Sequence, residues 1–85
     1  MTRKQITDYI DDAVFKVMDT STPSHMNLNF NNYNQLIASG SQKLYGVQQA
    51  DGSVKVEYAG IEVRKTPRPD EPSFVVAMNG SKVYI

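Results

Sequence analysis

The sequence predicts one α+β domain in which an N-terminal amphipathic helix packs on an antiparallel β-meander of about five strands, with a short second helical turn between them. Three observations lead to this prediction. Apolar residues repeat at helical spacing near the N-terminus, Gly-containing turn dipeptides divide the second half, and a proline-rich loop follows at 66–72. The 85 residues are enough for one domain, 1–85, and no repeat or linker divides them.

The first helix is expected from about Thr2 to Asp19. Thr2 and Gln5 have the spacing of a capping box, and Pro23 cannot continue the helix beyond the polar run that follows it. The apolar residues repeat at i, i+3, i+4 and i+7, which predicts one buried stripe. The stripe consists of Ile6, Tyr9, Ile10, Ala13, Val14, Val17 and Met18.

An asparagine-rich connector is expected next. Met26, Leu28 and Phe30 alternate with asparagines, a pattern that indicates a short extended segment with one apolar face. Asn32 is placed to cap a short helical turn, which Gly40 would end. We therefore interpret this stretch as a turn-rich connector.

The second half of the chain has β signals. Asp51-Gly52 and Asn79-Gly80 are dipeptides that two-residue type I′ turns prefer, because both central residues need positive φ. Ala59-Gly60 is expected to form a third turn. The alternative is one long strand, kinked by a bulge at Gly60. We favour the meander, whose registers pair Val47 with Val56, Tyr45 with Tyr58, Tyr58 with Ile61 and Val56 with Val63.

The last hairpin is expected to pair residues 73–78 with residues 81–85. In that register both faces carry apolar side chains, which predicts a hairpin covered on both sides. One short helix covers one side only, so the domain is expected to need a partner. One face would carry Phe74, Val76, Met78, Val83 and Ile85, and the other would carry Val75, Ala77 and Tyr84 beside Lys82.

Composition excludes several classes of protein. Nine basic and nine acidic residues give no net charge, which disfavours a nucleic-acid binder, because such proteins carry a basic excess. Cysteine is absent and His25 is the only histidine, so no cofactor or metal site is predicted. No apolar run approaches the roughly 20 residues of a membrane span, and no secretory signal is recognisable. A cytoplasmic protein without a membrane partner fits these features.

Phe15 is the first candidate for partner binding. At about 100° per residue it projects nearly opposite the centre of the apolar stripe, among Asp8, Asp11 and Asp12. An aromatic ring inside a polar rim is typical of an interface anchor. The alternatives are that the connector folds over Phe15 or that the ring is simply exposed. The three carboxylates are expected on a solvated helix face, which disfavours acid–base or metal chemistry there.

Two other places could bind a partner or a ligand. Tyr84 and Ile85 end the last strand, which is expected at a sheet edge open to a neighbouring chain. Arg64, Lys65 and Arg68 form a basic cluster that could bind a small anionic ligand. Charged residues at strand ends also protect edges from aggregation, and that interpretation is the commoner one.

The sequence therefore favours a non-catalytic protein-interaction module that associates with itself or with another protein. No nucleophile and base stand in a recognisable relationship, so an enzyme is not predicted. One alternative is a structural subunit of a larger, virion-like assembly, and another is a nucleotide or small-ligand binder with a pocket between subunits. A small chain without cysteine is also in the style of phage or mobile-element accessory proteins that bind a host factor, although no motif supports this.

Overall fold

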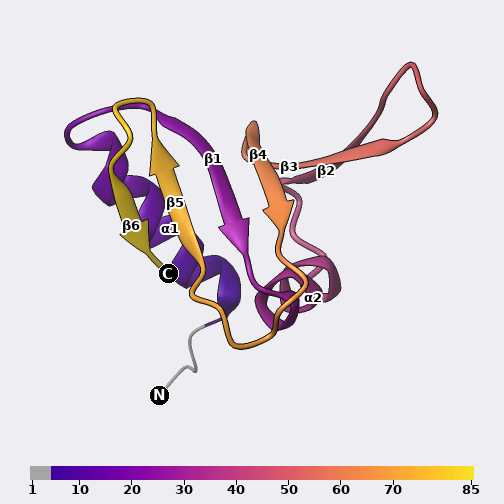
Figure 1. Cartoon of the computed structure of the whole chain (residues 1–85), viewed down its shortest axis with the longest axis horizontal. Helices are drawn as coiled ribbons and strands as arrows, with labels where there is room; N and C mark the ends of the chain where they lie inside the picture. Colours follow the sequence, from indigo (N-terminus) through magenta and orange to yellow (C-terminus); the bar gives the residue numbers. More distant parts are fainter. Residues whose placement is uncertain (1–4) are drawn as a thin grey trace.

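Two helices lie against one face of a mixed sheet in the computed structural model, which describes residues 5–85 (Figure 1). The α+β class and the layout of a helix followed by a meander are confirmed, with one more strand than expected. The strand order is β2-β3-β4-β1-β5-β6. The elements are α1 (Ile6–Met18), β1 (Pro23–Leu28), α2 (Phe30–Ala38), β2 (Leu44–Gln48), β3 (Val54–Tyr58), β4 (Ile61–Lys65), β5 (Phe74–Ala77) and β6 (Lys82–Tyr84).

Helix α1 begins at Ile6, later than the sequence predicts. Gln5 is its N-cap, and the Asp8 carboxylate accepts a hydrogen bond from the Gln5 N–H at 2.8 Å. This bond satisfies one of the backbone donors that a helix N-terminus leaves without an internal partner. The expected cap Thr2 lies outside the described residues. The predicted apolar stripe is confirmed in its centre, where Ile10, Ala13 and Val17 are buried.

Strand β1 is the additional strand, and it lies in the middle of the sheet. It pairs in parallel with β4 and antiparallel with β5. The predicted extended segment is confirmed at Met26 and Leu28, whose side chains are completely buried, but it is wrong at Phe30, which begins α2. Its central position was not predicted, because parallel pairing joins segments that are far apart in sequence. The meander is therefore interrupted between β4 and β5.

The connector after β1 folds into a helix longer than the predicted turn. Asn29, rather than Asn32, is the N-cap of α2, and its side chain accepts from the Asn32 N–H at 2.8 Å. The Asn29 side-chain amide donates to the Glu71 carbonyl at 2.7 Å, and its backbone N–H donates to the Ser73 hydroxyl at 2.9 Å. Asn29 therefore holds the start of α2 against the proline-rich loop.

The Ala59-Gly60 turn has the predicted register, which pairs Tyr58 with Ile61. Both turn residues have positive φ, 53° and 81°, as a type I′ turn requires. The meander is thus confirmed over the long kinked strand. The face predicted for Val54, Val56, Tyr58, Ile61 and Val63 is also confirmed, because these residues alternate correctly along β3 and β4.

The other two turns are one residue longer than predicted. Gln49 donates to the Ser53 carbonyl at 2.7 Å, and Ala77 donates to the Ser81 carbonyl at 2.8 Å. Each bond closes a three-residue loop with glycine at positive φ in its last position. The predicted registers are therefore wrong by one residue. The observed pairs include Val47 with Lys55, Tyr45 with Glu57, Val75 with Val83 and Phe74 with Tyr84.

The shift changes which face of the last hairpin each residue occupies. Val75 and Ala77 are buried on the face covered by α1, and Val83 shares that face. Phe74 and Tyr84 point to the opposite side, so the predicted division of the hairpin is wrong. The core consists of Ile10, Ala13, Val17, Met26, Leu28, Leu36, Tyr58, Ile61, Val63, Val75 and Ala77.

Candidate functional site

The sheet presents one face that residues 5–85 leave without a covering layer. The helices pack on the opposite face, where Met26, Leu28 and Val75 are completely buried. Because side chains alternate along a strand, their sequence neighbours point away from the helices. We call this side the open face. It carries His25, Asn27, Tyr45, Val47, Lys55, Glu57, Glu62, Arg64, Phe74, Val76, Lys82 and Tyr84.

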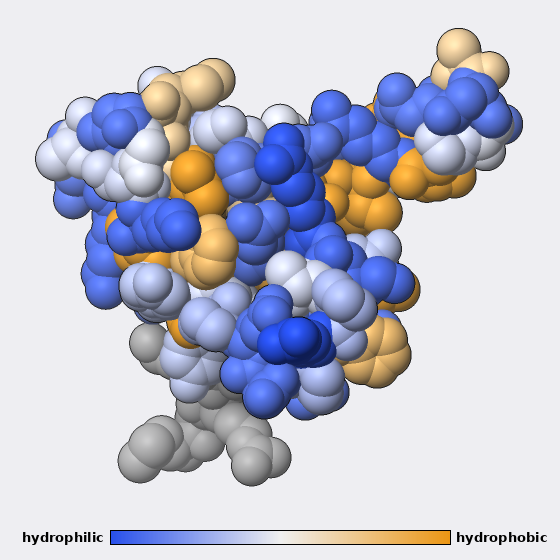
Figure 2. Space-filling view, viewed as in Figure 1, coloured by the Kyte–Doolittle hydropathy of each residue, from blue (hydrophilic) through white to orange (hydrophobic). Residues whose placement is uncertain are grey.

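The middle of the open face is a row of polar contacts. Glu62 accepts from Arg64 Nε at 3.0 Å and lies 3.6 Å from Lys55 Nζ. Arg64 Nη1 in turn lies 3.4 Å from His25 Nε2, and the Ser24 hydroxyl lies 3.1 Å from His25 Nδ1. His25 therefore lies on a strand, with a polar partner at each ring nitrogen. Figure 2 shows mainly hydrophilic atoms over this middle part.

The charges in this row affect the protonation of two groups. Burial and the Arg64 charge lower the pKa of His25, and Glu62 opposes them. The hydrogen bond from Arg64 lowers the pKa of Glu62 below its usual value. A histidine that activates a nucleophile is normally oriented and made more basic by a carboxylate. His25 has a guanidinium at one ring nitrogen instead, which disfavours that role.

An aromatic cluster occupies one end of the open face. The rings of Phe74 and Tyr84 meet edge to face with centroids 5.7 Å apart. Lys82 Nζ lies 4.8 Å from the centroid of the Phe74 ring. Tyr84, a predicted partner-binding residue, is 63% exposed here. Ile85, predicted to act with it, packs partly buried against the core on the helix side, so the two residues do not form one surface.

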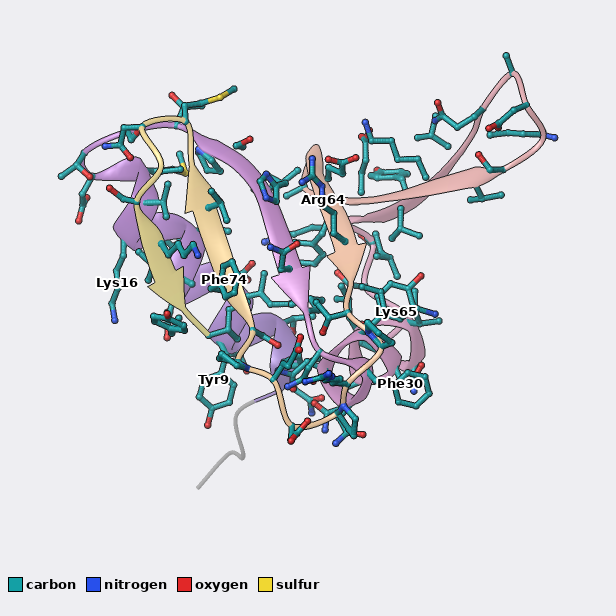
Figure 3. All side chains as sticks on the ribbon, viewed as in Figure 1. Tyr9, Lys16, Phe30, Arg64, Lys65 and Phe74 are labelled. Atoms are coloured by element: carbon teal, nitrogen blue, oxygen red, sulfur yellow. The ribbon has the colours of Figure 1, made fainter. Side chains whose placement is uncertain are left out.

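The predicted basic cluster is divided between different surroundings. Arg64 lies on the open face beside Glu62, whereas Lys65 Nζ lies 5.1 Å from the centroid of Tyr33. Figure 3 shows Lys65 beside Phe30 of α2, away from Arg64. Arg68 Nε lies 3.8 Å from a Glu71 carboxylate oxygen. The structure does not bring these three cations together around one anion.

The predicted acidic surface around Phe15 is also divided. Phe15 is 69% exposed on α1, and Asp12 is exposed on the same helix. Asp8 is engaged as a helix cap. Asp11 faces the sheet, where its carboxylate accepts from the Tyr58 hydroxyl at 2.9 Å and lies 3.4 Å from Lys43 Nζ. The expectation that all three carboxylates lie on the solvated side is therefore wrong for Asp11.

Tyr58 is the buried partner in its hydrogen bond with Asp11. Its side chain is almost completely buried, and the loss of solvent together with the nearby Asp11 carboxylate raises the pKa of Tyr58 to about 12. A phenol in this environment stays protonated and donates its hydrogen bond throughout the neutral range. The pair therefore joins α1 to β3 and has the properties of a structural contact.

A cleft of about 800 Å³ lies between α1, α2 and the end of the chain. Arg64, Lys65 and Arg68, which were predicted to bind an anionic ligand, are not among the residues that line this cleft. Within residues 5–85 no group of three or more histidine, aspartate or glutamate side chains could hold a metal ion, and no helix there is long and apolar enough to cross a membrane. The cleft between α1, α2 and the end of the chain is lined by Gln5, Ile6, Tyr9, Asn32, Gln35, Ala38, Ser39 and Ile85.

Strand β2 is the candidate that the sequence did not reveal. It forms one edge of the sheet, and the β2–β3 hairpin projects from the rest of the molecule (Figure 1). Tyr45 is 60% exposed and Val47 is 40% exposed on its open face. In the sequence, only the absence of charge over residues 44–50 could have indicated this edge, because such an absence is unusual for a strand at a sheet edge.

Comparisons with known protein families, with curated proteins and with solved structures found no match.

Proposed function

We propose that the protein is a non-catalytic interaction module that associates with itself. The observation that carries this proposal is the open face, which has large apolar side chains at both ends and no covering layer within residues 5–85. Tyr45 and Val47 lie at one end, and Phe74 and Tyr84 lie at the other. The solvent face of an antiparallel sheet is normally polar, so exposed aromatic groups there favour a binding surface.

The contacts of the titratable groups support a role without catalysis. The His25 ring meets the Ser24 hydroxyl at one nitrogen, but its other nitrogen faces the Arg64 guanidinium, where a nucleophile-activating histidine would have a carboxylate. The Tyr58 hydroxyl is held by Asp11 between α1 and β3. Both arrangements are typical of contacts that stabilise the fold, and they leave binding as the function that the surfaces favour.

The size of the chain also favours association. A domain of this length buries roughly 60–65% of the surface that its unfolded chain exposes, which leaves a small stability margin. Disulfides are excluded because the sequence has no cysteine. A second chain placed against Tyr45 and Val47 would bury apolar area, and each 100 Å² would contribute about 2.5 kcal/mol before association costs.

The solution mass tests this proposal. Sedimentation equilibrium from low to high micromolar concentration should give a mass that rises above 9.5 kDa towards a multiple of it. The variant Lys16→Ala serves as a control, because Lys16 is exposed on α1, which packs on the side of the sheet opposite the open face. It should associate as the wild type does. A mass that stays at the value for one chain over the whole concentration range would refute self-association.

A structural subunit of a larger assembly is a second candidate, favoured by one observation. Both β2 and β6 are edges of the sheet formed by the described residues. A contact between β2 of one chain and β6 of the next is a head-to-tail contact, and it gives extended assemblies where its rotation does not close a ring. Electron microscopy of concentrated protein distinguishes the two candidates, since filaments support the second and small particles of uniform size support the first.

A further inference from the structure

We propose that β2 pairs with β2 of a second copy, antiparallel, around a two-fold axis that lies midway between the two copies of Gly46. This inference rests on the proposed self-association and specifies its surface. It would join two sheets into one continuous sheet, with Tyr45 of each chain opposite the partner's Val47. Three properties of β2 support it: the direction of its backbone groups, its self-complementary sequence, and its place on a projecting hairpin.

The hydrogen bonds to β3 determine which backbone groups of β2 point outwards. The Lys43 carbonyl accepts from Ala59 at 2.8 Å, and the Gln49 N–H donates to Ser53 at 2.7 Å. In an antiparallel pair, residues alternate between bonding the neighbouring strand and pointing away from it. Residues 43, 45, 47 and 49 therefore bond β3, and the backbone groups of residues 44, 46 and 48 point to the edge.

These outward groups match a second copy of the same strand. With Gly46 opposite Gly46, each Gly46 N–H can donate to the Gly46 carbonyl of the other chain. Each Gln48 N–H can donate to the Leu44 carbonyl of the other chain. The Leu44 N–H already donates to the Ser41 carbonyl at 3.2 Å, so the ends of the pairing would be weaker than its centre.

The side chains agree with the same register. Tyr45 and the partner's Val47 would be opposite each other at the positions without hydrogen bonds, where facing side chains come closest. Aromatic and β-branched residues are a favourable cross-strand pair. On β3, Lys55 pairs with Val47 and Glu57 pairs with Tyr45. A line of facing residues across the joined sheet would then run from Lys55 through Val47 of one chain to Tyr45 and Glu57 of the other. Each line has a lysine at one end and a glutamate at the other, so like charges do not face each other.

The two edges of the sheet differ in how well they suit this contact. Strand β2 has five residues and no charge or proline. Strand β6 has three residues and begins with Lys82, both features that protect an edge from pairing. The β2–β3 hairpin also projects beyond the helices (Figure 1), which leaves its edge accessible to a second chain. These differences favour β2 as the edge that pairs.

A charge-swap experiment tests the pairing. One variant carries Tyr45→Lys with Val47→Lys, and the other carries Tyr45→Glu with Val47→Glu. In the proposed register, residue 45 of one chain faces residue 47 of the other, so each variant alone places like charges opposite each other. Sedimentation equilibrium should then give 9.5 kDa for each variant, against about twice that mass for the wild type. An equimolar mixture should recover the doubled mass.

The control puts the same charges near the other edge. Met78→Lys and Met78→Glu change an exposed methionine in the turn between β5 and β6, far from β2 in the strand order, and each should keep the wild-type mass. Circular dichroism of each variant should give the wild-type spectrum, which checks that the variant is folded. If the double variants at residues 45 and 47 keep the wild-type mass, or if their mixture stays at the mass of one chain, the β2 pairing is wrong. Either result leaves the proposed self-association unrefuted. A wild type that stays at the mass of one chain refutes both proposals.

Discussion

The hydrogen bond between Tyr58 and Asp11 gives the sharpest test of the fold. Its two oxygens are 2.9 Å apart and join α1 to β3, residues that are 47 positions apart in sequence. The variant Tyr58→Phe removes the hydroxyl and keeps the buried ring. A hydrogen bond to a charged group contributes about 1.5–3 kcal/mol. The Asp11 side chain is 33% exposed, and water can replace part of the lost bond. We therefore expect the free energy of unfolding to fall by about 1–2 kcal/mol.

The same contact has a pH dependence of defined sign. The pKa of Tyr58 is raised from 10.0 to about 12 in the folded state. Above pH 10 the unfolded chain loses the phenol proton while the folded chain keeps it, so the free energy of unfolding falls as pH rises. The contribution of Tyr58 is thus fully present below pH 10 and is lost between pH 10 and 12. Because Tyr58→Phe has no phenol, its stability should fall less steeply over this range.

Urea denaturation of both proteins at pH 7 and at about pH 11 measures this effect. The wild type should be more stable than Tyr58→Phe by about 1–2 kcal/mol at pH 7, and this difference should shrink at the higher pH. Tyr84→Phe is the control, because Tyr84 is exposed and its change should stay within about 0.5 kcal/mol. A difference that is absent at pH 7, or that is unchanged at the higher pH, would show that the hydroxyl does not hold α1 on the sheet.

Three further substitutions test other parts of the structure by urea denaturation. The variant Ser73→Ala removes a buried hydroxyl that accepts from the Asn29 N–H and the Asn32 side-chain amide, and it should cost about 1–3 kcal/mol. An unchanged stability would contradict the proposed link between α2 and the proline-rich loop. The variant Ala59→Gly should stabilise the protein by up to about 1 kcal/mol, because Ala59 has a φ of +53° that glycine adopts without strain. A destabilisation would show that this turn is not strained. The variant Phe15→Ala should change stability by less than about 0.5 kcal/mol, and a larger loss would mean that the ring is not exposed as the structure has it.

The local elements of the fold could be predicted from the sequence. The stripe through Ile10, Ala13 and Val17 needs only the helical period, and the registers around Ala59-Gly60 agree with each other because one slip would invert a whole face. Both predictions depend on residues close together in the chain. The parallel pairing of β1 with β4 does not, because partners such as Met26 and Val63 are far apart in sequence and no short pattern specifies the pairing.

The candidate site was harder to predict for the same reason. Phe15 is exposed, as the helical period predicts. Asp11 does not share the exposed side of α1 with Phe15, because the Asp11 carboxylate accepts a hydrogen bond from the Tyr58 hydroxyl of β3. Helical angles alone do not show such a contact. Arg64 and Lys65 are adjacent in sequence, yet adjacent residues of a strand point to opposite faces. Their separation could have been foreseen from the strand that the sequence already predicted.

The length of one turn determines the character of the proposed binding edge. A two-residue turn at Asp51-Gly52 would have placed Tyr45 opposite Tyr58, on the helix side of the sheet. The observed three-residue loop places Leu44 opposite Tyr58 instead, and it turns Tyr45 and Val47 to the open face. The same loop directs the backbone of residues 44, 46 and 48 outwards. One residue in the loop therefore sets both the exposed apolar pair and the hydrogen-bonding groups beside it, which is why the two features coincide on β2.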